Sequence, residues 1–245
     1  MFSITDANTY NTSYMSTPVN PDEFVITRRR KKYKFAKFHN AANCFELSEW
    51  QRRAVDVIEV GAGTGLFSVE LAARHPELTF VALDVKADRL QKGAYEALSR
   101  GVDNIFFVRA RADQVAELAT PGTVSKVWLT FPDPFGRTRS AGRRLTHPTF
   151  LAHYQRLLHT DGSLYLKHDN QEFFCWSLEQ LIAAGWRVIE LTFDLHSSLL
   201  SDEYKILTTY EQRWLDQGLV THFVCAQKPH LAKTLQSLPA QSVHR

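Results

Sequence analysis

The chain has 245 residues, of which 44% are apolar, and this is enough to bury one large core, although length alone also permits two small domains. No apolar run approaches the roughly 20 residues of a membrane span, and the polar N-terminus lacks the apolar core of a signal peptide. The net charge of +3 is mild, and three cysteines without metal-ligand spacing indicate reduced thiols. We therefore expect a cytoplasmic protein with no bound metal and no membrane association.

Residues 1–40 are predicted to form a mobile basic arm. The first 25 are polar and show no periodicity that could bury a face. Arg28 to Phe38, RRRKKYKFAKF, then mixes cations with aromatic side chains, and this mixture suits RNA, because cations neutralise phosphates and aromatics stack on bases. A solvated charge run or a localisation tract is the alternative interpretation.

Asp56 to Leu66, DVIEVGAGTGL, is the segment around which the rest of the chain is organised. A β-branched strand enters a glycine-rich turn, and a helix from Leu66 to Arg74 is predicted to follow directly. The turn lets a ligand approach the backbone, and the first N–H groups of the helix point into the same space. A lone glycine triplet is equally compatible with an ordinary turn. The glycines are Gly61, Gly63 and Gly65.

Acidic residues around this turn indicate which ligand it suits. Leu66 stands where a dinucleotide fingerprint has its third glycine, and Glu59 would repel a phosphate but could accept hydrogen bonds from a cationic amino group. The next predicted strand, Thr79 to Leu83, ends at Asp84, where a doubly wound sheet has its ribose-binding acid. Together these features resemble class I S-adenosylmethionine-dependent methyltransferases more than dehydrogenases.

Strands and helices continue to alternate along the chain, which predicts a doubly wound, mostly parallel Rossmann-like sheet with helices on both faces. We assign residues 41–229 to this one domain and 230–245 to a flexible tail. The predicted helices are Asp88–Arg100, Asp113–Ala119, Pro148–Leu158, Gln171–Ala184 and Glu203–Gln217, and the predicted strands are Ile105–Arg109, Val124–Phe131, Ser163–His168, Arg187–Asp194 and Val220–Gln227.

Three later motifs, in order, carry a more specific resemblance. They are FPDPFGRTRSAGRRL at Phe131 to Leu145, KHDN at Lys167 to Asn170 and TTYE at Thr208 to Glu211. With the glycine-rich turn, they resemble the tRNA (guanine-N7)-methyltransferase family, whose pattern is FPDPW, a basic loop ending in RRL, K-T-D-N and T-x-x-E. The likeness covers about Val55 to Gln227.

The resemblance implies that the protein uses S-adenosyl-L-methionine to methylate N7 of a guanosine in the variable loop of tRNA. Guanine N7 has a free lone pair, so the reaction needs no general base, and a carboxylate that accepts from guanine N1–H would stabilise the developing charge. The alternative role for Asp133 is to cap a turn. The assigned residues are Asp133 as catalytic acid position; Glu59, Gly61, Gly63, Asp84, Arg111 and Asp133 for the cofactor; Arg137, Asp169, Thr208, Thr209, Tyr210 and Glu211 for the substrate; and Arg139, Arg143 and Arg144 for the RNA backbone.

The chain departs from the family pattern at several positions. Phe135 replaces the usual tryptophan and Ser140 a usual histidine, whereas Arg111 stands where an acid or amide near adenine is common. Gly136 and Gly142 replace a frequent proline and a basic residue. A methyltransferase with another substrate and an RNA-binding protein with a degenerate site therefore remain alternatives.

Overall fold

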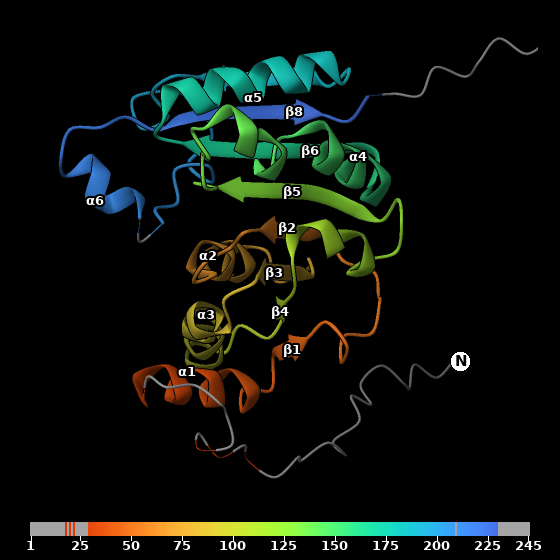
Figure 1. The fold of residues 1–245 in the computed structure, drawn as a ribbon, viewed down its shortest axis with the longest axis vertical. Coiled ribbons are helices and arrows are strands. Elements are labelled where there is room, and N and C mark those ends of the chain that lie inside the picture. The colour runs from red at the N-terminus through yellow and green to blue at the C-terminus, as the bar shows by residue number, and fades with distance from the viewer. Residues whose placement is uncertain (1–17, 19, 21, 23–28, 209, 230–245) are drawn as a thin grey trace, which may run out of the picture.

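A computed structural model describes residues 18, 20, 22, 29–208 and 210–229. Its described strands form one eight-stranded sheet in the order β1-β4-β3-β2-β5-β6-β8-β7. Strands β1 to β6 pair in parallel, and β8 inserts antiparallel between β6 and β7 (Figure 1). The strands are β1 (Cys44–Glu46), β2 (Val57–Val60), β3 (Phe80–Asp84), β4 (Ile105–Arg109), β5 (Val124–Thr130), β6 (Leu158–His168), β7 (Arg187–Thr192) and β8 (His222–Gln227).

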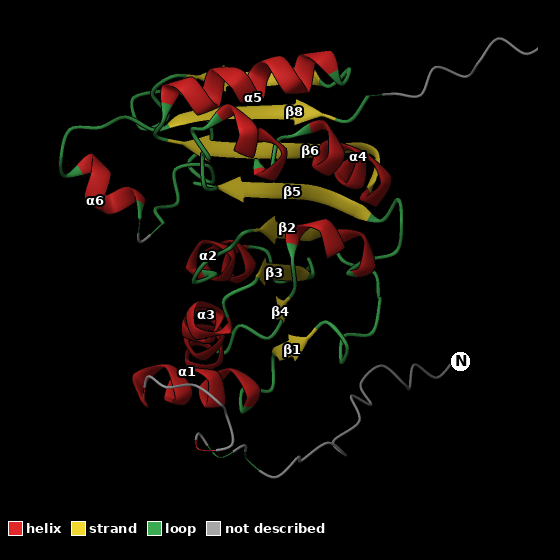
Figure 2. Cartoon of the chain, viewed as in Figure 1, coloured by secondary structure: helices red, strands yellow, loops and turns green. Residues whose placement is uncertain are grey.

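Helices cover both faces of the sheet, as expected where the central parallel strands are apolar on both sides. One core cluster lies between the sheet and α1, α2 and α3, and the other lies between the sheet and η2, α4 and α5. Figure 2 shows α5 beside β8 at one end of the molecule and α1 beside α3 at the other. The helices are α1 (Arg29–His39), α2 (Leu66–Arg74), α3 (Ala87–Arg100), α4 (Pro148–Leu157), α5 (Gln171–Ala183) and the 3-10 helix η2 (Ala112–Glu117).

The predicted fold class is confirmed, and most predicted elements have the expected type and position. The predicted helix Glu203–Gln217 is wrong, because only α6 (Glu211–Leu215) is helical there. Lys167 Nζ binds the Ile206 carbonyl at 2.9 Å, and this contact holds the preceding segment in an irregular path. The short strand β1 and the 3-10 helix η3 (Thr138–Arg143) were not predicted.

Helix α1 corrects the predicted boundary of the basic arm. The packed part of the chain starts before residue 41, because Phe38 is fully buried in the same cluster as Ala94 and Ala97 of α3. Lys31 and Lys37 of this helix remain exposed, and Lys37 Nζ lies 5.4 Å from the ring centroid of Tyr95 in α3. The charged run is therefore a helix anchored to the domain. Most of residues 1–28 and all of the predicted tail at 230–245 lie outside the described residues.

Truncating Phe38 tests this anchoring. We expect Phe38→Ala to lower the free energy of unfolding by about 3–5 kcal/mol, because it leaves a cavity between α1 and α3. Lys31→Ala, at an exposed position of the same helix, should change it by less than about 0.5 kcal/mol. Denaturant unfolding of both variants measures the difference. Equal values for the two variants would mean that α1 does not stabilise the domain.

Candidate active site

A cavity of about 820 Å³ opens at the carboxyl ends of β2, β3, β5 and β6. The loop from β2 to α2 forms one wall, and its three glycines have φ values between 57° and 76°, in the left-handed region that favours glycine. A Cβ at Gly65 would lie 2.6 Å from the ring of Phe107, whereas a Cβ at Gly63 would meet no atom within 4 Å. Gly65 is therefore needed for packing, and Gly63 for the course of the loop.

Glu59 lies deep in the cavity wall on β2 and is 1% exposed. Its two carboxylate oxygens accept hydrogen bonds from Ser68 Oγ at 2.6 Å and Thr130 Oγ1 at 2.5 Å. Burial raises the pKa of Glu59 to about 7, although both hydroxyls favour the ionised form. No described cation forms a salt bridge with this carboxylate, so a cationic ligand group would stabilise it.

The raised pKa of Glu59 predicts that ionisation of this carboxyl group destabilises the folded protein. Between its usual value of 4.5 and about 7, the folded state binds this proton more tightly than the unfolded state, so stability falls as pH rises through that window. We expect Glu59→Gln, without cofactor, to be more stable than wild type at pH 8 by up to about 3 kcal/mol and to lose this advantage near pH 4.

Denaturant unfolding at the two pH values measures this effect. The exposed Glu96 of α3 offers a matched control, since Glu96→Gln makes the same chemical change without burial. A Glu59→Gln variant that is less stable than wild type at pH 8 would contradict the prediction.

Asp84 ends β3 and faces the glycine-rich loop. Its Oδ2 accepts from the Gly63 N–H at 2.9 Å, and its Oδ1 accepts from the Lys86 N–H at 2.8 Å. Each oxygen keeps a further lone pair that could accept from a ligand hydroxyl. The structure thus brings Asp84 and Glu59 to the same cavity, as the sequence predicts.

Arg111 departs from its predicted place in the cofactor site. Its side chain is 73% exposed and forms a two-point contact with Asp113, with N···O distances of 3.0 and 2.5 Å. The neighbouring Ala110 and Ala112 line the cavity instead. The reason is the bend into η2, which turns the two alanines inward and the arginine outward.

Asp133 also lines the cavity, in the Pro-Asp-Pro segment that follows β5. Asp133 is exposed and has no hydrogen-bond partner among the described residues. On either side, Phe131 and Phe135 have φ values of 49° and 41°, a conformation that costs a non-glycine residue of order 1–3 kcal/mol. Such strain persists only where the surroundings hold it, and it sets the direction in which this short segment enters the cavity.

Arg144 holds this segment from inside the fold, which corrects its predicted role as an RNA contact. It is 7% exposed, and its guanidinium donates to the carbonyls of Pro134 at 3.0 Å and Phe135 at 3.2 Å. The guanidinium also lies over the ring of Trp176, 4.4 Å from its centroid. The guanidinium is therefore engaged within the protein by two carbonyls and an aromatic ring.

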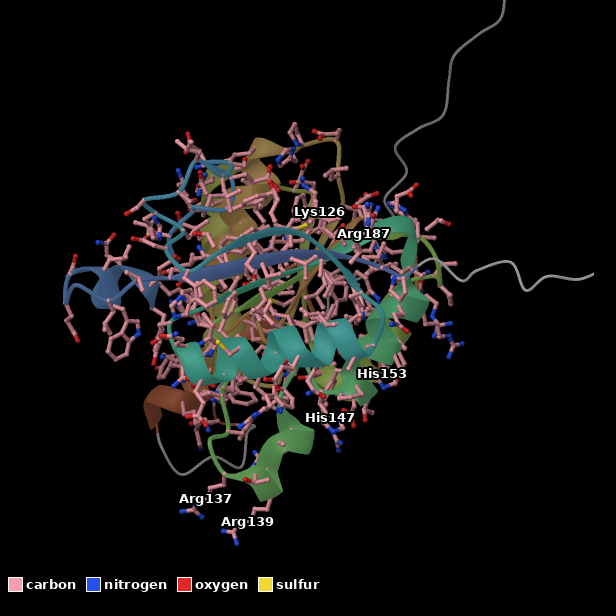
Figure 3. All side chains as sticks on the ribbon, turned by 90° about the horizontal axis from the view of Figure 1, so that it is seen from above. Lys126, Arg137, Arg139, His147, His153 and Arg187 are labelled. Atoms are coloured by element: carbon pink, nitrogen blue, oxygen red, sulfur yellow. The ribbon has the colours of Figure 1, made fainter. Side chains whose placement is uncertain are left out.

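The other three arginines of the loop face outward. Arg143 lines the cavity and lies 4.3 Å from the ring centroid of Phe135. Arg137 and Arg139 are exposed at the start of η3, and Figure 3 shows both projecting away from the body of the molecule. The predicted cationic surface thus consists of these three residues and excludes Arg144.

The different environments of Arg143 and Arg144 can be tested by substitution. Arg144→Ala should lower the free energy of unfolding by about 2–4 kcal/mol, because two half-buried carbonyls lose their donor and the packing of the guanidinium on Trp176 is lost. Arg143→Ala should change it by less than about 1 kcal/mol. Thermal or denaturant unfolding distinguishes them, and similar effects of both substitutions would contradict the inward placement of Arg144.

Asp169 lies at the end of β6 and lines the cavity close to Asp133, in the segment His168-Asp169-Asn170. The Asn170 side chain accepts from the Phe173 N–H at 2.7 Å and begins α5. The strand end and the helix start therefore fix the backbone on both sides of Asp169. This places the predicted substrate-binding acid in the same cavity as the predicted catalytic acid.

The motif at Thr208 to Glu211 divides between the cavity and the core. Thr208 and Tyr210 line the cavity, and Thr209 lies outside the described residues. Glu211 is fully buried and accepts from Lys167 Nζ at 2.8 Å, from Thr221 Oγ1 at 3.1 Å and from the Thr208 N–H at 3.1 Å. Its other partner is His196 Nε2 at 2.9 Å. The prediction that Glu211 contacts substrate is corrected, because its oxygens are already used inside the protein.

Some residues of the site were not assigned from sequence. Ser68 and Thr130 donate hydrogen bonds to Glu59. Only their positions in the sequence could have indicated this role: Ser68 lies in the first turn of α2, and Thr130 is the last residue of β5. Lys167 and His168 belong to a motif that was recognised, but only its aspartate was assigned. Within the described residues, no group of three or more His, Cys, Asp or Glu side chains could hold a metal ion. No described helix is long and apolar enough to cross a membrane.

The parallel sheet, the glycine-rich loop after β2 and the acid that ends β3 define a Rossmann-like methyltransferase. The structure is similar to that of the 16S rRNA methyltransferase KamB, with a TM-score of 0.54 and 16% identity over 74% of this chain and 90% of that chain. At this identity the likeness concerns the fold. A family model described as a putative methyltransferase matches residues 53–224.

Curated relatives define the family more closely. The tRNA (guanine-N(7)-)-methyltransferase of Brevibacillus brevis is 37% identical over 66% of this chain and 75% of its own length. The enzyme of the same name from Bacteroides thetaiotaomicron is 36% identical over 71% of this chain and 68% of its own. The chain belongs to the tRNA (guanine-N(7)-)-methyltransferase family.

Proposed function

We propose that this protein transfers a methyl group from S-adenosyl-L-methionine to N7 of a guanosine in cytoplasmic tRNA, with the variable loop as the expected target. The observation that carries the proposal is the convergence of four acidic residues from four strand ends on one cavity beside the glycine-rich loop. They are Glu59, Asp84, Asp133 and Asp169. Family membership makes tRNA guanine the expected substrate.

The residues of the cavity fit the cofactor. When bound, S-adenosylmethionine supplies an electrophilic methyl group on a sulfonium. Asp84 would accept hydrogen bonds from the ribose hydroxyls, and Glu59 would provide the negative charge that faces the cationic part of the methionine. Gly61 and Gly63 would leave room for the ligand beside the backbone. Arg111 is left out of this assignment.

The chemistry then depends on positioning and electrostatics. Guanine N7 carries a lone pair, so no residue has to remove a proton before it attacks the methyl carbon. Asp133 and Asp169 would accept hydrogen bonds from guanine N1–H and the exocyclic amine, and these bonds strengthen as positive charge develops on the purine. Both carboxylates act as hydrogen-bond acceptors throughout the methyl transfer.

Aromatic side chains at the cavity mouth suit a purine. Tyr210 is 53% exposed, and its ring centroid lies 6.1 Å from that of Phe131. Both residues line the cavity next to Asp133. An unstacked base could therefore lie against an aromatic face while its polar edge meets the carboxylates.

Two cationic surfaces would contact the phosphates of the tRNA. Arg137, Arg139 and Arg143 lie on the loop beside Asp133. The exposed lysines of α1 lie on a helix that packs against α3, and Lys86 and Arg89 at the start of α3 line the same cavity. Such contacts provide affinity and orientation more than sequence discrimination.

Methylation of a tRNA transcript by the purified protein tests the proposed function. We expect N7-methylguanosine on nucleoside analysis, and we expect Asp133→Asn to lower the single-turnover rate about 100-fold while tRNA affinity changes less than about threefold. Asp161→Asn, at an exposed position of β6 that does not line the cavity, is the matched control. Cofactor binding without any N7-methylguanosine would indicate another substrate. A wild-type rate in Asp133→Asn would remove Asp133 from the reaction.

The outward arginines predict a change in salt dependence. Replacing Arg137 and Arg139 by Ala should weaken tRNA binding and reduce the slope of log K against log salt by up to about two units. Arg156→Ala with Arg187→Ala removes the same charge from other exposed positions, and Figure 3 shows Arg187 far from the loop. Binding titrations at several salt concentrations measure the slopes. Equal reductions in both double variants would mean that the loop has no special contact with RNA.

A further inference from the structure

His168 connects the two segments that carry Asp133 and Asp169. It is the last residue of β6 and is 3% exposed. Its Nε2 lies 2.8 Å from the carbonyl oxygen of Pro132, the residue before Asp133. Its Nδ1 lies 2.8 Å from the backbone nitrogen of Asn170, the residue after Asp169. One imidazole ring therefore spans the gap between the ends of β5 and β6.

The two contacts determine where the proton of the ring is. A backbone N–H can only donate, so Nδ1 accepts from Asn170 and carries no proton. The proton is then on Nε2, which donates it to the Pro132 carbonyl. Burial lowers the pKa of His168, which agrees with a neutral ring.

Because the ring is neutral, the carboxylate of Asp169 is also available to accept hydrogen bonds from a substrate. Asp169 Oδ1 lies 3.2 Å from Nδ1, but this nitrogen has no proton to give while it accepts from Asn170. Protonation of Nδ1 would end the contact with the Asn170 N–H and create an ion pair with Asp169. The carboxylate would then be held by the ring and would be a poorer acceptor for a substrate.

The segment on the Pro132 side needs support from its surroundings. Phe131 has a φ of 49°, and its N–H donates to the Lys167 carbonyl at 2.9 Å. The hydrogen bond from His168 to Pro132 follows immediately, so two consecutive residues of β6 hold two consecutive residues of the strained turn. The ring of His168 packs against Phe173 at a centroid distance of 4.5 Å, which limits its rotation.

We propose that His168 is a positioning residue whose neutral Nε2–H ring fixes Asp133 and Asp169 relative to each other, so that both carboxylates can contact one purine. This inference rests on the proposed function. The family pattern K-T-D-N has threonine at this position, whereas this chain has a histidine whose two ring nitrogens contact the two segments.

Charged groups around the ring predict how it responds to pH. Asp169, on its own strand end, and Asp133, on the loop after β5, both favour the protonated ring, whereas burial and His222 of β8 oppose it. As the pH falls and the ring gains a proton at Nδ1, the Asn170 contact is lost and Asp169 is drawn to the ring. Methyl transfer should therefore decline in acid because of His168.

Single-turnover methylation of tRNA by the full-length chain tests the proposal. His168→Ala removes both contacts and should lower the rate at least about tenfold, with cofactor affinity within about twofold of wild type. His168→Gln keeps an N–H donor at the position of Nε2 and should recover part of the rate, without the decline in acid that depends on the ring. His222→Gln changes a buried histidine of the neighbouring strand that does not line the cavity. At pH 8, where the ring of His168 is neutral, it should keep the wild-type rate within about twofold. A wild-type rate in His168→Ala, or equal losses in His168→Ala and His222→Gln, would overturn the proposal.

A spectroscopic measurement on wild type covers the case in which His168→Ala does not fold. The ¹⁵N resonances of the ring should show an unprotonated Nδ1 and a protonated Nε2 at neutral pH. The opposite tautomer or a charged ring would overturn the proposal. This result does not depend on substrate, so failure of the wild-type protein to methylate tRNA would reject the proposed function separately.

Discussion

The buried ion pair between Lys167 and Glu211 is the interaction on which the substrate side of the cavity depends. Both side chains are fully buried, and Lys167 Nζ lies 2.8 Å from Glu211 Oε2. Burial lowers the pKa of Lys167, and the adjacent carboxylate opposes this effect. Removing one partner of such a pair typically costs 3–5 kcal/mol, because the other charge is left buried without compensation.

This ion pair connects segments that are distant in sequence. Lys167 belongs to β6, Glu211 begins α6, and Thr221, which also binds Glu211, comes just before β8. Thr208 and Glu211 exchange hydrogen bonds at the start of α6, and Tyr210 directly precedes the buried Glu211. The position of Tyr210 at the cavity mouth is thus determined from the core.

Sequence reasoning predicted the layout of the site because that layout follows from topology. Carboxyl ends of parallel strands meet at one edge of a sheet, so Glu59, Asp84 and Asp133 could be brought together from strand patterns alone. The directions of individual side chains were harder to predict. Arg143 and Arg144 are neighbours of identical chemistry, but one faces outward and the other binds two carbonyls inside the fold. Only the path of the loop distinguishes them, and that path depends on contacts with α5.

Two secondary-structure predictions, the mobile arm at α1 and the long helix before α6, are wrong because side-chain contacts distant in sequence were not predicted. The charged run of α1 suggested a solvated arm, because Phe38 and Ala36 are few among many cations, although they are the residues that pack against the domain. The segment before α6 has helical spacing, but the buried amine of Lys167 takes the Ile206 carbonyl. In both cases a tertiary contact outweighed the local pattern.

The packing of α1 on α3 also has a geometric consequence. The lysines of α1 are carried by a helix that is anchored through Phe38, and α3 in turn begins at the cavity wall. The backbone that carries these charges is therefore already packed on the domain, so less backbone entropy has to be lost when a ligand binds. Helix α1 acts as a rigid spacer: a polyanion that contacts its lysines can place in the cavity only the part of itself that lies at the matching distance.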